Sequence, residues 1–317
     1  MPLTIFGVEV AGHLALMIAF AVMLVYTVRS HRQISRYVTS SQIMYWIILA
    51  LSGMFAVVGA IRLIFLLKNG VAGGMSPLMD LLAEYPSVVA QSIIIFYLIA
   101  NKIVSERTSC PLRVLAIGAH PDDLEIAAGA TLARVFDSGH EVYGLVMTHG
   151  ARGGNAKVRP EEARQGGKFL GLSHVKIMDF NDTHLADQSD EMVQAIEEQI
   201  RLVKPDVILT HSIHDIHQDH QAVYEATLRA GRTQGSILCY ESPSVTAEFR
   251  PTFFVDVNQY VHVKIEAVRT HWDQRGKPYM KEEQIRGKLA FRGGQAKVEY
   301  AEGFEVVRMV SSNIGEF

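Results

Sequence analysis

The sequence predicts an α/β protein, with a Rossmann-like, mostly parallel sheet that carries helices on both faces, preceded by transmembrane helices. From Leu112 onward, short runs rich in β-branched residues alternate with helical stretches, the pattern of strands joined by crossover helices. Up to Ser105 the chain is apolar and holds six Lys or Arg and three acidic residues, against 24 and 30 in the remainder. The positive mean hydropathy, +0.14, therefore comes from the first third of the chain.

Three ranges in the apolar part are candidate transmembrane helices: 10–28, 43–67 and, with polar flanks, 87–104. The first two are long enough to cross a hydrocarbon core of about 30 Å. The loop 29–42 contains three arginines, and the positive-inside rule places such a loop in the cytoplasm. We therefore predict an integral membrane protein with two to three spans over 1–105, a linker over 106–111 and a soluble domain over 112–317. Its N-terminus is expected outside, and its soluble domain in the cytoplasm.

The soluble domain is expected to start with alternating strands and helices. The strands are predicted at Arg113–Gly118, His140–Thr148, Val175–Phe180 and Asp206–Thr210. The helices between them are predicted at Leu124–Ser138, Pro160–Leu170 and Asp190–Val203, the second with proline in its first turn and Gly171 after its end.

Histidines and carboxylates follow three of these strands. The first strand leads into His120-Pro-Asp-Asp123, the second into His149, and the fourth into His211 and the cluster His214, His217 and His220. Because ligands bind beyond the carboxyl ends of strands in such sheets, we expect these side chains to share one rim.

This residue set is typical of a hydrolytic zinc site, which needs three nitrogen or oxygen ligands and an open position for water. His120 and one aspartate of the Asp122-Asp123 pair can supply two ligands, and the other aspartate is then placed as a general base. The third ligand is expected among His214, His217 and His220, and spacing alone leaves the choice open. Two cysteines without a C-x-x-C pattern indicate no thiolate site, and a net charge of −3 indicates no nucleic-acid partner.

The segments Ala119-His-Pro-Asp-Asp-Leu-Glu125 and His217-Gln-Asp-His220 resemble the two main motifs of the LmbE/PIG-L family of zinc de-N-acetylases. Further similarities follow in family order, and the resemblance covers 112–310 and none of the apolar part. They are Gly129-Ala-Thr131, Arg159-Pro-Glu-Glu162, Leu170-Gly171, Asp179-Phe-Asn-Asp182, Lys264 and Tyr300-Ala-Glu-Gly-Phe304.

The resemblance implies a role for each matching residue. His120, Asp123 and His220 would bind Zn²⁺, with another divalent ion such as Fe²⁺ as an alternative. Asp122 would be the general base, His217 would polarise the carbonyl or protonate the leaving amine, and Asp219 would orient a histidine. Arg159 and Asp182 match positions that contact sugar hydroxyls in relatives.

One segment departs from the family pattern. Where the family usually has glutamate after the glycine of the second strand end, this chain reads His149-Gly-Ala-Arg-Gly-Gly-Asn155. We hypothesise that Arg152, in this glycine-rich loop, binds a phosphate of the substrate. The alternative is that Arg152 only closes the loop on a surface carboxylate.

Together these features predict a zinc-dependent hydrolase that removes an acetyl group from an N-acetylamino sugar of the GlcNAc type. The predicted anchor suggests a sugar linked to a lipid or phosphate, with the bilayer as a partner. One alternative is a zinc amidase acting on a non-sugar acyl amide. A second is a metal-bound membrane module that binds a sugar or nucleotide without catalysis, although such a module would not need Asp122. The sequence indicates no oligomeric state.

Overall fold

The computed structural model describes Thr108 and residues 110–314, together with scattered helical positions between Ile18 and Lys68. The chain divides into two units, residues 1–103 and 104–317. The second unit is described almost continuously and carries the two main motifs and the predicted site residues.

The strands and helices alternate along most of this unit. The strands are β1 (Arg113–Gly118), β2 (Glu141–Thr148), β3 (His174–Phe180), β4 (Val207–Thr210), β5 (Ile237–Tyr240), β6 (Phe253–Asp256) and β7 (Ala301–Arg308). The helices are α5 (Asp123–Asp137), α6 (Arg159–Leu170), α7 (Ser189–Val203), α8 (Gln218–Ala230), α9 (Val261–Val268), α10 (Glu282–Ala296) and α11 (Ser311–Ile314). Short 3₁₀ turns are η2 (Leu185–Gln188), η3 (Asn258–Tyr260), η4 (Trp272–Gln274) and η5 (Pro278–Met280).

The seven strands form one mixed sheet in the order β3-β2-β1-β4-β5-β7-β6. The five strands from β3 to β5 pair in parallel, and β7 is antiparallel to both β5 and β6. The predicted α/β fold with a mostly parallel sheet is therefore confirmed. The antiparallel edge was not predicted.

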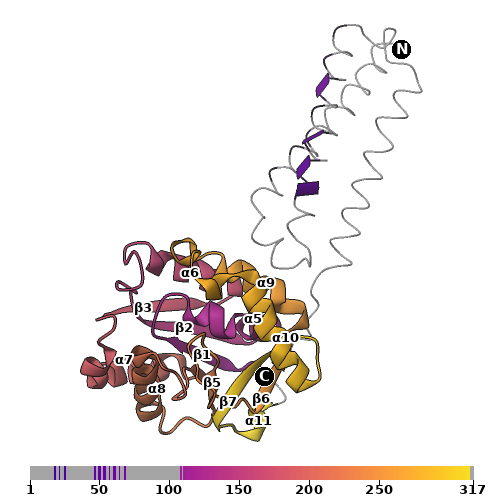
Figure 1. Ribbon diagram of the computed structural model, residues 1–317. Helices are drawn as coiled ribbons and strands as arrows, with labels where there is room; N and C mark the ends of the chain where they lie inside the picture. Colours follow the sequence, from indigo (N-terminus) through magenta and orange to yellow (C-terminus); the bar gives the residue numbers. More distant parts are fainter. Residues whose placement is uncertain are drawn as a thin grey trace. The chain divides into compact units, whose positions relative to one another are not determined.

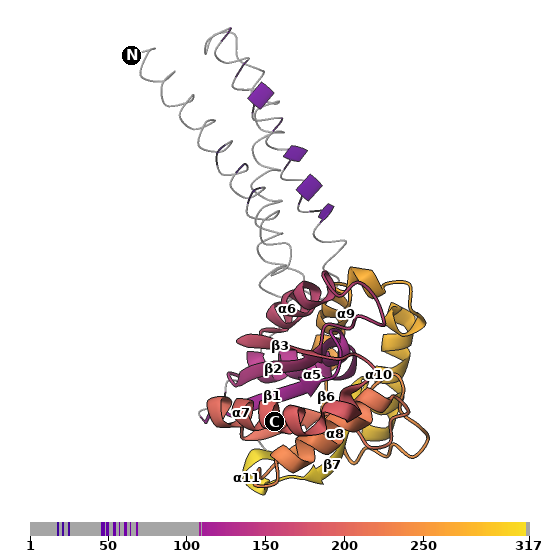
Figure 2. The ribbon, with the colours of Figure 1, turned by 90° about the vertical axis from the view of Figure 1, so that its left-hand side faces the viewer.

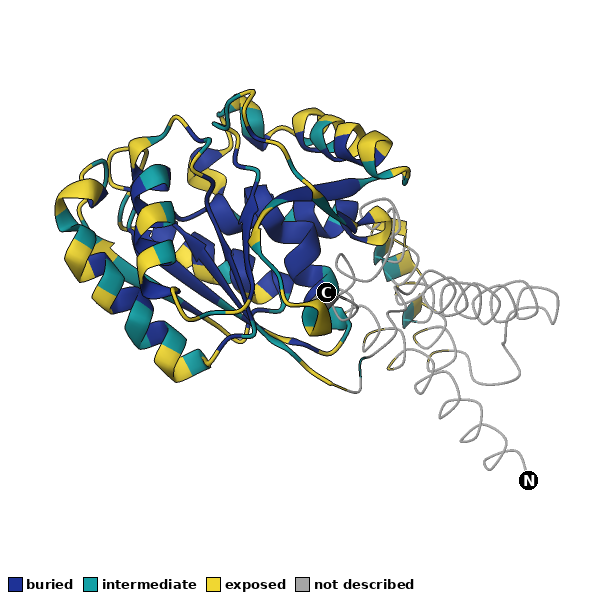
Figure 3. Cartoon of the chain, turned by 90° about the horizontal axis from the view of Figure 1, so that it is seen from below, coloured by how far each residue is buried: buried dark blue, intermediate teal, exposed yellow. Residues whose placement is uncertain are grey.

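Helices cover both faces of the sheet, as expected for parallel strands that are buried on both sides (Figures 1 and 2). Helices α5, α6, α9 and α10 lie on one face, and α7 and α8 on the other. Successive side chains of β1 point to opposite faces of the sheet. Leu115 and Ile117 point to the face covered by α7 and α8, where they join the core cluster that contains Ile196 of α7 and Val223 of α8. The buried residues accordingly concentrate in the strands and the inner sides of the helices (Figure 3).

The ends of α6 follow from its sequence. Pro160 stands in its first turn, where a missing N–H costs nothing. The helix ends at Leu170 because Gly171 adopts a left-handed conformation with φ 91°, and a side chain there would meet the ring of Phe136. Both predictions for this helix agree with the structure to within one residue.

The predicted membrane anchor is corrected by the structure. In the part of the chain that the structure describes, no helix has the length and apolar character needed to cross a bilayer. The prediction of an integral membrane protein, with its N-terminus outside and its catalytic domain in the cytoplasm, is contradicted by this finding. Most of 10–28 and 43–67 and all of 87–104 lie outside the described residues, and the domain boundaries stay predictions.

A buried ion pair links the late part of the chain to α5. The ammonium of Lys264 on α9 lies 2.5 Å from Oε1 of Glu302 on β7, and both residues are only 2–3% exposed. The same carboxylate accepts hydrogen bonds from the backbone N–H groups of Ala130 and Thr131. Two of the weaker sequence similarities therefore have a structural role, since they hold α5 against the sheet.

We expect Glu302→Met to destabilise the protein by about 3–5 kcal/mol, because it leaves the Lys264 ammonium buried without its partner. The double variant Lys264→Met/Glu302→Met should lose clearly less, since no charge is then left unpaired. Urea unfolding of both variants measures the difference, and equal losses would show that the ion pair is not the cause.

Candidate active site

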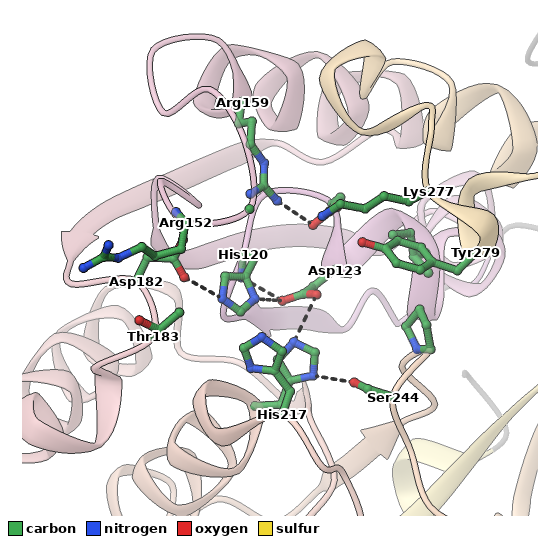
Figure 4. Close-up of a pocket in the computed structure, with 15 residues that line it drawn as sticks. His120, Asp123, Arg152, Arg159, Asp182, Thr183, His217, Ser244, Lys277 and Tyr279 are labelled. Carbon is green, nitrogen blue, oxygen red and sulfur yellow. Dashed lines mark hydrogen bonds and ion pairs between the residues drawn. The ribbon is translucent and has the colours of Figure 1, made fainter.

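The carboxyl ends of β1, β3 and β4 bring the predicted residues to one edge of the sheet. His120, Asp122 and Asp123 follow β1, Asp182 follows β3, and the loop after β4 leads to His217 and to α8. Most of them line a single cavity of about 350 Å³, shown in Figure 4, which is of the size that small-molecule sites take. Its lining includes the predicted residues His120, Asp122, Asp123, Arg152, Arg159, Asp182, His217 and His220.

His120, Asp123 and His220 converge at the floor of this cavity. Nδ1 of His120 lies 3.6 Å from Oδ2 of Asp123, and Nε2 of His220 lies 3.5 Å from Oδ1 of the same carboxylate. Two ligands bound at about 2.0–2.1 Å to a tetrahedral zinc ion lie roughly 3.3–3.4 Å apart. The donor types of these three residues, and the spacing of each histidine from Asp123, are compatible with a divalent metal such as zinc.

The other histidines near this point allow further ligand sets. Three sets of described residues place three ligand atoms within 4.8 Å of one another: His120 with His217 and His220, Asp123 with His211 and His220, and His120 with Asp182 and Asp219. The predicted set of His120, Asp123 and His220 is not one of these three, although each of its members belongs to at least one of them. His211 is fully buried, and its Nε2 accepts a hydrogen bond from the N–H of Ala119, which ties that nitrogen to the backbone. His214, left open by the sequence, turns away and hydrogen-bonds Glu305 at 2.9 Å.

Carboxylates contact both of the histidines predicted to bind a metal, His120 and His220. Nε2 of His120 lies 3.1 Å from Asp219 and 3.2 Å from Asp182, which leaves Nδ1 free for a metal. Burial lowers the pKa of His120, but hydrogen bonds with Asp123, Asp182 and Asp219 outweigh burial and raise it well above the usual value. Asp219, predicted to orient a histidine, thus contacts His120, and Asp182 contacts the same ring.

Asp215 holds the ring of His220 by a hydrogen bond, as Asp219 holds the ring of His120. Asp215 was not predicted from the sequence. Its Oδ2 lies 2.8 Å from Nδ1 of His220, and its carboxylate also accepts hydrogen bonds from Ser242, Ser244 and the N–H of His217. The charges of Asp123 and Asp215 overcome the effect of burial and raise the pKa of His220 to about 9. A metal-binding histidine needs such an acceptor, and this requirement could have drawn attention to an aspartate five residues before His220.

We expect Asp215→Asn to weaken zinc affinity by about 10- to 100-fold, because a neutral amide fixes the His220 ring less firmly than the carboxylate does. Competition with a fluorescent chelator measures the affinity. Asp206→Asn is a suitable control, since Asp206 caps the N–H of Arg113 at the opposite end of the sheet. An Asp215→Asn protein with wild-type affinity would contradict this role.

Asp122 lies in a strained and buried position. Its φ of 125° is in the region that favours glycine, and the residue is 4% exposed. Burial raises the pKa of its carboxyl, and the positive charge of Arg159 offsets part of this rise. The Arg159 guanidinium donates a hydrogen bond to Oδ1 of Asp122 at 3.1 Å. Backbone strain persists only where the surroundings impose it, and Asp122 lines the cavity together with its neighbour Asp123.

His217 immediately precedes α8 and caps it. Its Nδ1 accepts the N–H of Asp219 at 3.2 Å, so the proton of the neutral ring sits on Nε2. Burial, together with the charges of His220 and His120, lowers the pKa of His217, which favours the neutral ring. The ring stacks on His220 with centroids 4.5 Å apart, and its Nε2–H is available as a hydrogen-bond donor in the cavity.

The three predicted substrate contacts differ in their surroundings. Arg159 is 2% exposed and donates to the carbonyls of Gly150 and Pro121 as well as to Asp122, so its bonds hold the loop that carries Asp122. Arg152 is exposed, and its backbone N–H donates to Asp182 at 2.6 Å, while its side chain extends away from His120 (Figure 4). Lys277 and Tyr279, beside η5, also line the cavity, and the sequence analysis did not single them out.

Comparisons with known proteins agree with this geometry. The family model described as PIG-L, GlcNAc-PI de-N-acetylase, matches residues 115–231. The uncharacterized deacetylase YaiS of Escherichia coli is 39% identical over 165 residues, which are 50% of this chain and 89% of the relative. Diacetylchitobiose deacetylase of Thermococcus kodakarensis is 29% identical over 65% of this chain and 86% of the relative. The fold is similar to the crystal structure of a conserved protein from Thermus thermophilus. The TM-score is 0.57 and the sequence identity 26%, over 63% of this chain and 96% of that protein.

The matched range contains both principal motifs and all the predicted metal and catalytic residues. The similarity to the Escherichia coli deacetylase extends over nearly the whole of that relative. The chain therefore belongs to the PIG-L family of deacetylases and is a hydrolase.

Proposed function

We propose that this protein is a zinc-dependent de-N-acetylase of an N-acetylamino sugar of the GlcNAc type. The observation that carries the proposal is the placement of buried Asp122 beside the cluster of His120, Asp123 and His220 in one cavity. The sugar is supported by the similarity to a diacetylchitobiose deacetylase. A binding module would need the ligand cluster but no buried carboxylate held in a strained conformation.

A metal held by His120, Asp123 and His220 would lower the pKa of water to about 7 and polarise the amide carbonyl. Asp122 would take a proton from the water as its oxygen forms the new C–O bond. Nε2–H of His217 would donate a hydrogen bond to the carbonyl oxygen, where negative charge develops. The C–N bond then breaks, and the proton held by Asp122 passes to the leaving nitrogen, so that acetate and a free amine are released.

Of the two roles predicted for His217, the hydrogen bond from the N–H of Asp219 supports polarisation of the carbonyl. A neutral imidazole whose Nδ1 already accepts a hydrogen bond has one N–H to offer, on Nε2. Asp219 and Asp215 would orient His120 and His220 from behind. Arg159 would act by fixing Asp122, and sugar contacts by Arg159, Arg152 and Asp182 stay proposals.

The lipid-linked substrate expected from the sequence rested on the predicted membrane anchor, which the structure does not support. Free sugars and lipid-linked sugars are therefore two arms of the same test. The non-sugar amidase is the third arm, since its chemistry would use the same residues.

The test is acetate release by the zinc-loaded, full-length protein from N,N'-diacetylchitobiose, from a lipid-linked N-acetylglucosamine and from an N-acetyl amino acid, at equal concentrations. We expect the sugars to be hydrolysed at least tenfold faster than the amino acid. Faster release from the amino acid would favour the amidase, and no release from any substrate by a protein holding one metal per chain would favour the binding module.

A further inference from the structure

A cationic side chain that the proposed reaction does not use lines the cavity. Lys277, just before η5, is half-buried, and Figure 4 shows it entering the cavity from the same side as Tyr279. Among the residues that the structure describes, no carboxylate forms an ion pair with Lys277. Its nearest ring contact is Tyr279, with the ammonium 5.7 Å from the ring centroid.

The other two cations of the cavity are differently placed. The Arg159 guanidinium is engaged by Asp122 and by the carbonyls of Gly150 and Pro121. The Arg152 side chain extends away from the metal-ligand cluster (Figure 4). Lys277 is therefore the cavity cation whose charge is left for a ligand.

Gly153 keeps space open beside this ammonium. A Cβ at Gly153 would lie 3.5 Å from Nζ of Lys277 and 2.9 Å from Nη1 of Arg159, so both cations approach the same bare stretch of backbone. Arg159 is paired with Asp122, whereas no ion pair neutralises the ammonium of Lys277 among the described residues. In a partly enclosed cavity an unpaired ammonium attracts an anionic group of a ligand.

Tyr279 complements this charge with a neutral surface. Its hydroxyl has no hydrogen-bond partner among the described residues, and burial together with the charges of Asp122 and Asp123 raises the pKa of the phenol, so the hydroxyl stays protonated. A sugar that reaches from the metal-ligand cluster toward Lys277 would pass this ring, and aromatic rings with a polar tip suit such ligands.

From this arrangement we infer that the cavity has an oxyanion subsite formed by Lys277 beside Gly153, and that the preferred substrate is an N-acetylamino sugar bearing a phosphate or carboxylate. The inference rests on the proposed function and adds the charge class of the substrate. A lysine ammonium is a point charge with three rotatable donors, so it serves either anion without the fixed fork that arginine requires.

The experiment compares initial rates of acetate release from N-acetylglucosamine, N-acetylglucosamine 6-phosphate and N-acetylmuramic acid, which carry no anion, a phosphate and a carboxylate. For the wild-type protein we expect KM to be about tenfold lower for at least one anionic sugar than for the neutral one, as for a charged hydrogen bond. In Lys277→Met, KM for the anionic sugar should rise to the value for the neutral sugar. The kcat for the anionic sugar should change by less than about twofold, because a remote binding contact stabilises the ground and transition states equally. Lys277→Arg should retain the preference.

Lys281→Met is the matched control, since it removes the same charge from an exposed position four residues further on. It should leave KM for all three sugars unchanged. The inference is overturned if the wild type shows no preference for an anionic sugar, or if Lys277→Met raises KM equally for neutral and anionic sugars. Absence of acetate release from all three sugars would instead overturn the proposed function itself, so the two failures are distinguishable.

Discussion

With Asp122 replaced by asparagine, we expect kcat for deacetylation to fall by about 10²- to 10⁴-fold, the range in which a general base contributes. Asparagine keeps the shape of the side chain and an oxygen that can accept the hydrogen bond from Arg159, but it cannot take a proton from water. The residue is not among the three proposed ligands, so metal binding should persist. The measurement is the steady-state rate of acetate release by zinc-loaded variant and wild type.

Two readouts separate loss of the base from loss of the fold or the metal. Metal content should stay at one ion per chain, and the thermal midpoint should stay close to that of the wild type. Asp187→Asn is the control for a carboxylate lost elsewhere, because Asp187 is exposed on η2, and its rate should be unchanged. If Asp122→Asn hydrolysed the substrate within tenfold of the wild-type rate with metal bound, Asp122 would not be the base.

His220→Ala should have the other large effect, through the loss of the metal. His220 is 4% exposed, bonds to Asp215 and lies 3.5 Å from Asp123, so it is the α8 residue that directly faces the Asp123 carboxylate. Removing one of the three proposed protein ligands should reduce activity to background and abolish the rise in thermal midpoint that we expect zinc to produce in the wild type. A ligand that binds only the folded state at 100 times its dissociation constant adds about 2.7 kcal/mol of stability, which gives the scale of the lost zinc effect.

His214→Ala is the matched control, since the same substitution removes a histidine of the loop that leads into α8. The His214 side chain is 41% exposed and pairs with Glu305 rather than with the cluster. We expect this variant to bind zinc and to release acetate as the wild type does. The ligand has been assigned to the wrong histidine if zinc still raises the thermal midpoint of His220→Ala, or if zinc no longer raises that of His214→Ala.

The first half of the fold was predictable because its signals are local. The strand from Arg113 to Gly118 was placed without error, and α6 to within one residue, since β-branched runs, a proline in the first turn and a terminal glycine act over a few residues. The meeting of the candidate ligands in one cavity was predictable for a related reason. A strand end fixes where the next few side chains point, and His120-Pro-Asp-Asp123 follows β1 directly.

The second half depended on contacts that no local pattern encodes. Strand β7 pairs with β5 across more than 60 residues, and the ion pair of Lys264 and Glu302 joins it to α9 and α5. Asp215 was missed because its role is defined by a hydrogen bond to His220 that depends on the loop being folded back against Ser242 and Ser244. Lys277 was missed because a lysine between a glycine and a proline looks like an ordinary turn residue until η5 turns it into the cavity.

The membrane prediction failed for a different reason. Hydropathy counts apolar residues in a window, and 10–28 and 43–67 satisfy that count. Such a count takes no account of the structure, and the described residues contain no helix long and apolar enough to cross a bilayer.

The most direct test of the account is the paired release of acetate and free amine from N,N'-diacetylchitobiose by chelator-treated protein before and after one equivalent of zinc is restored. We expect no release before zinc and, after it, acetate and amine in equal amounts at a rate that Asp122→Asn reduces by about 10²-fold or more. Equal rates with and without the metal, or no release from protein that holds one zinc per chain, would contradict a metal-dependent deacetylase at His120, Asp123 and His220.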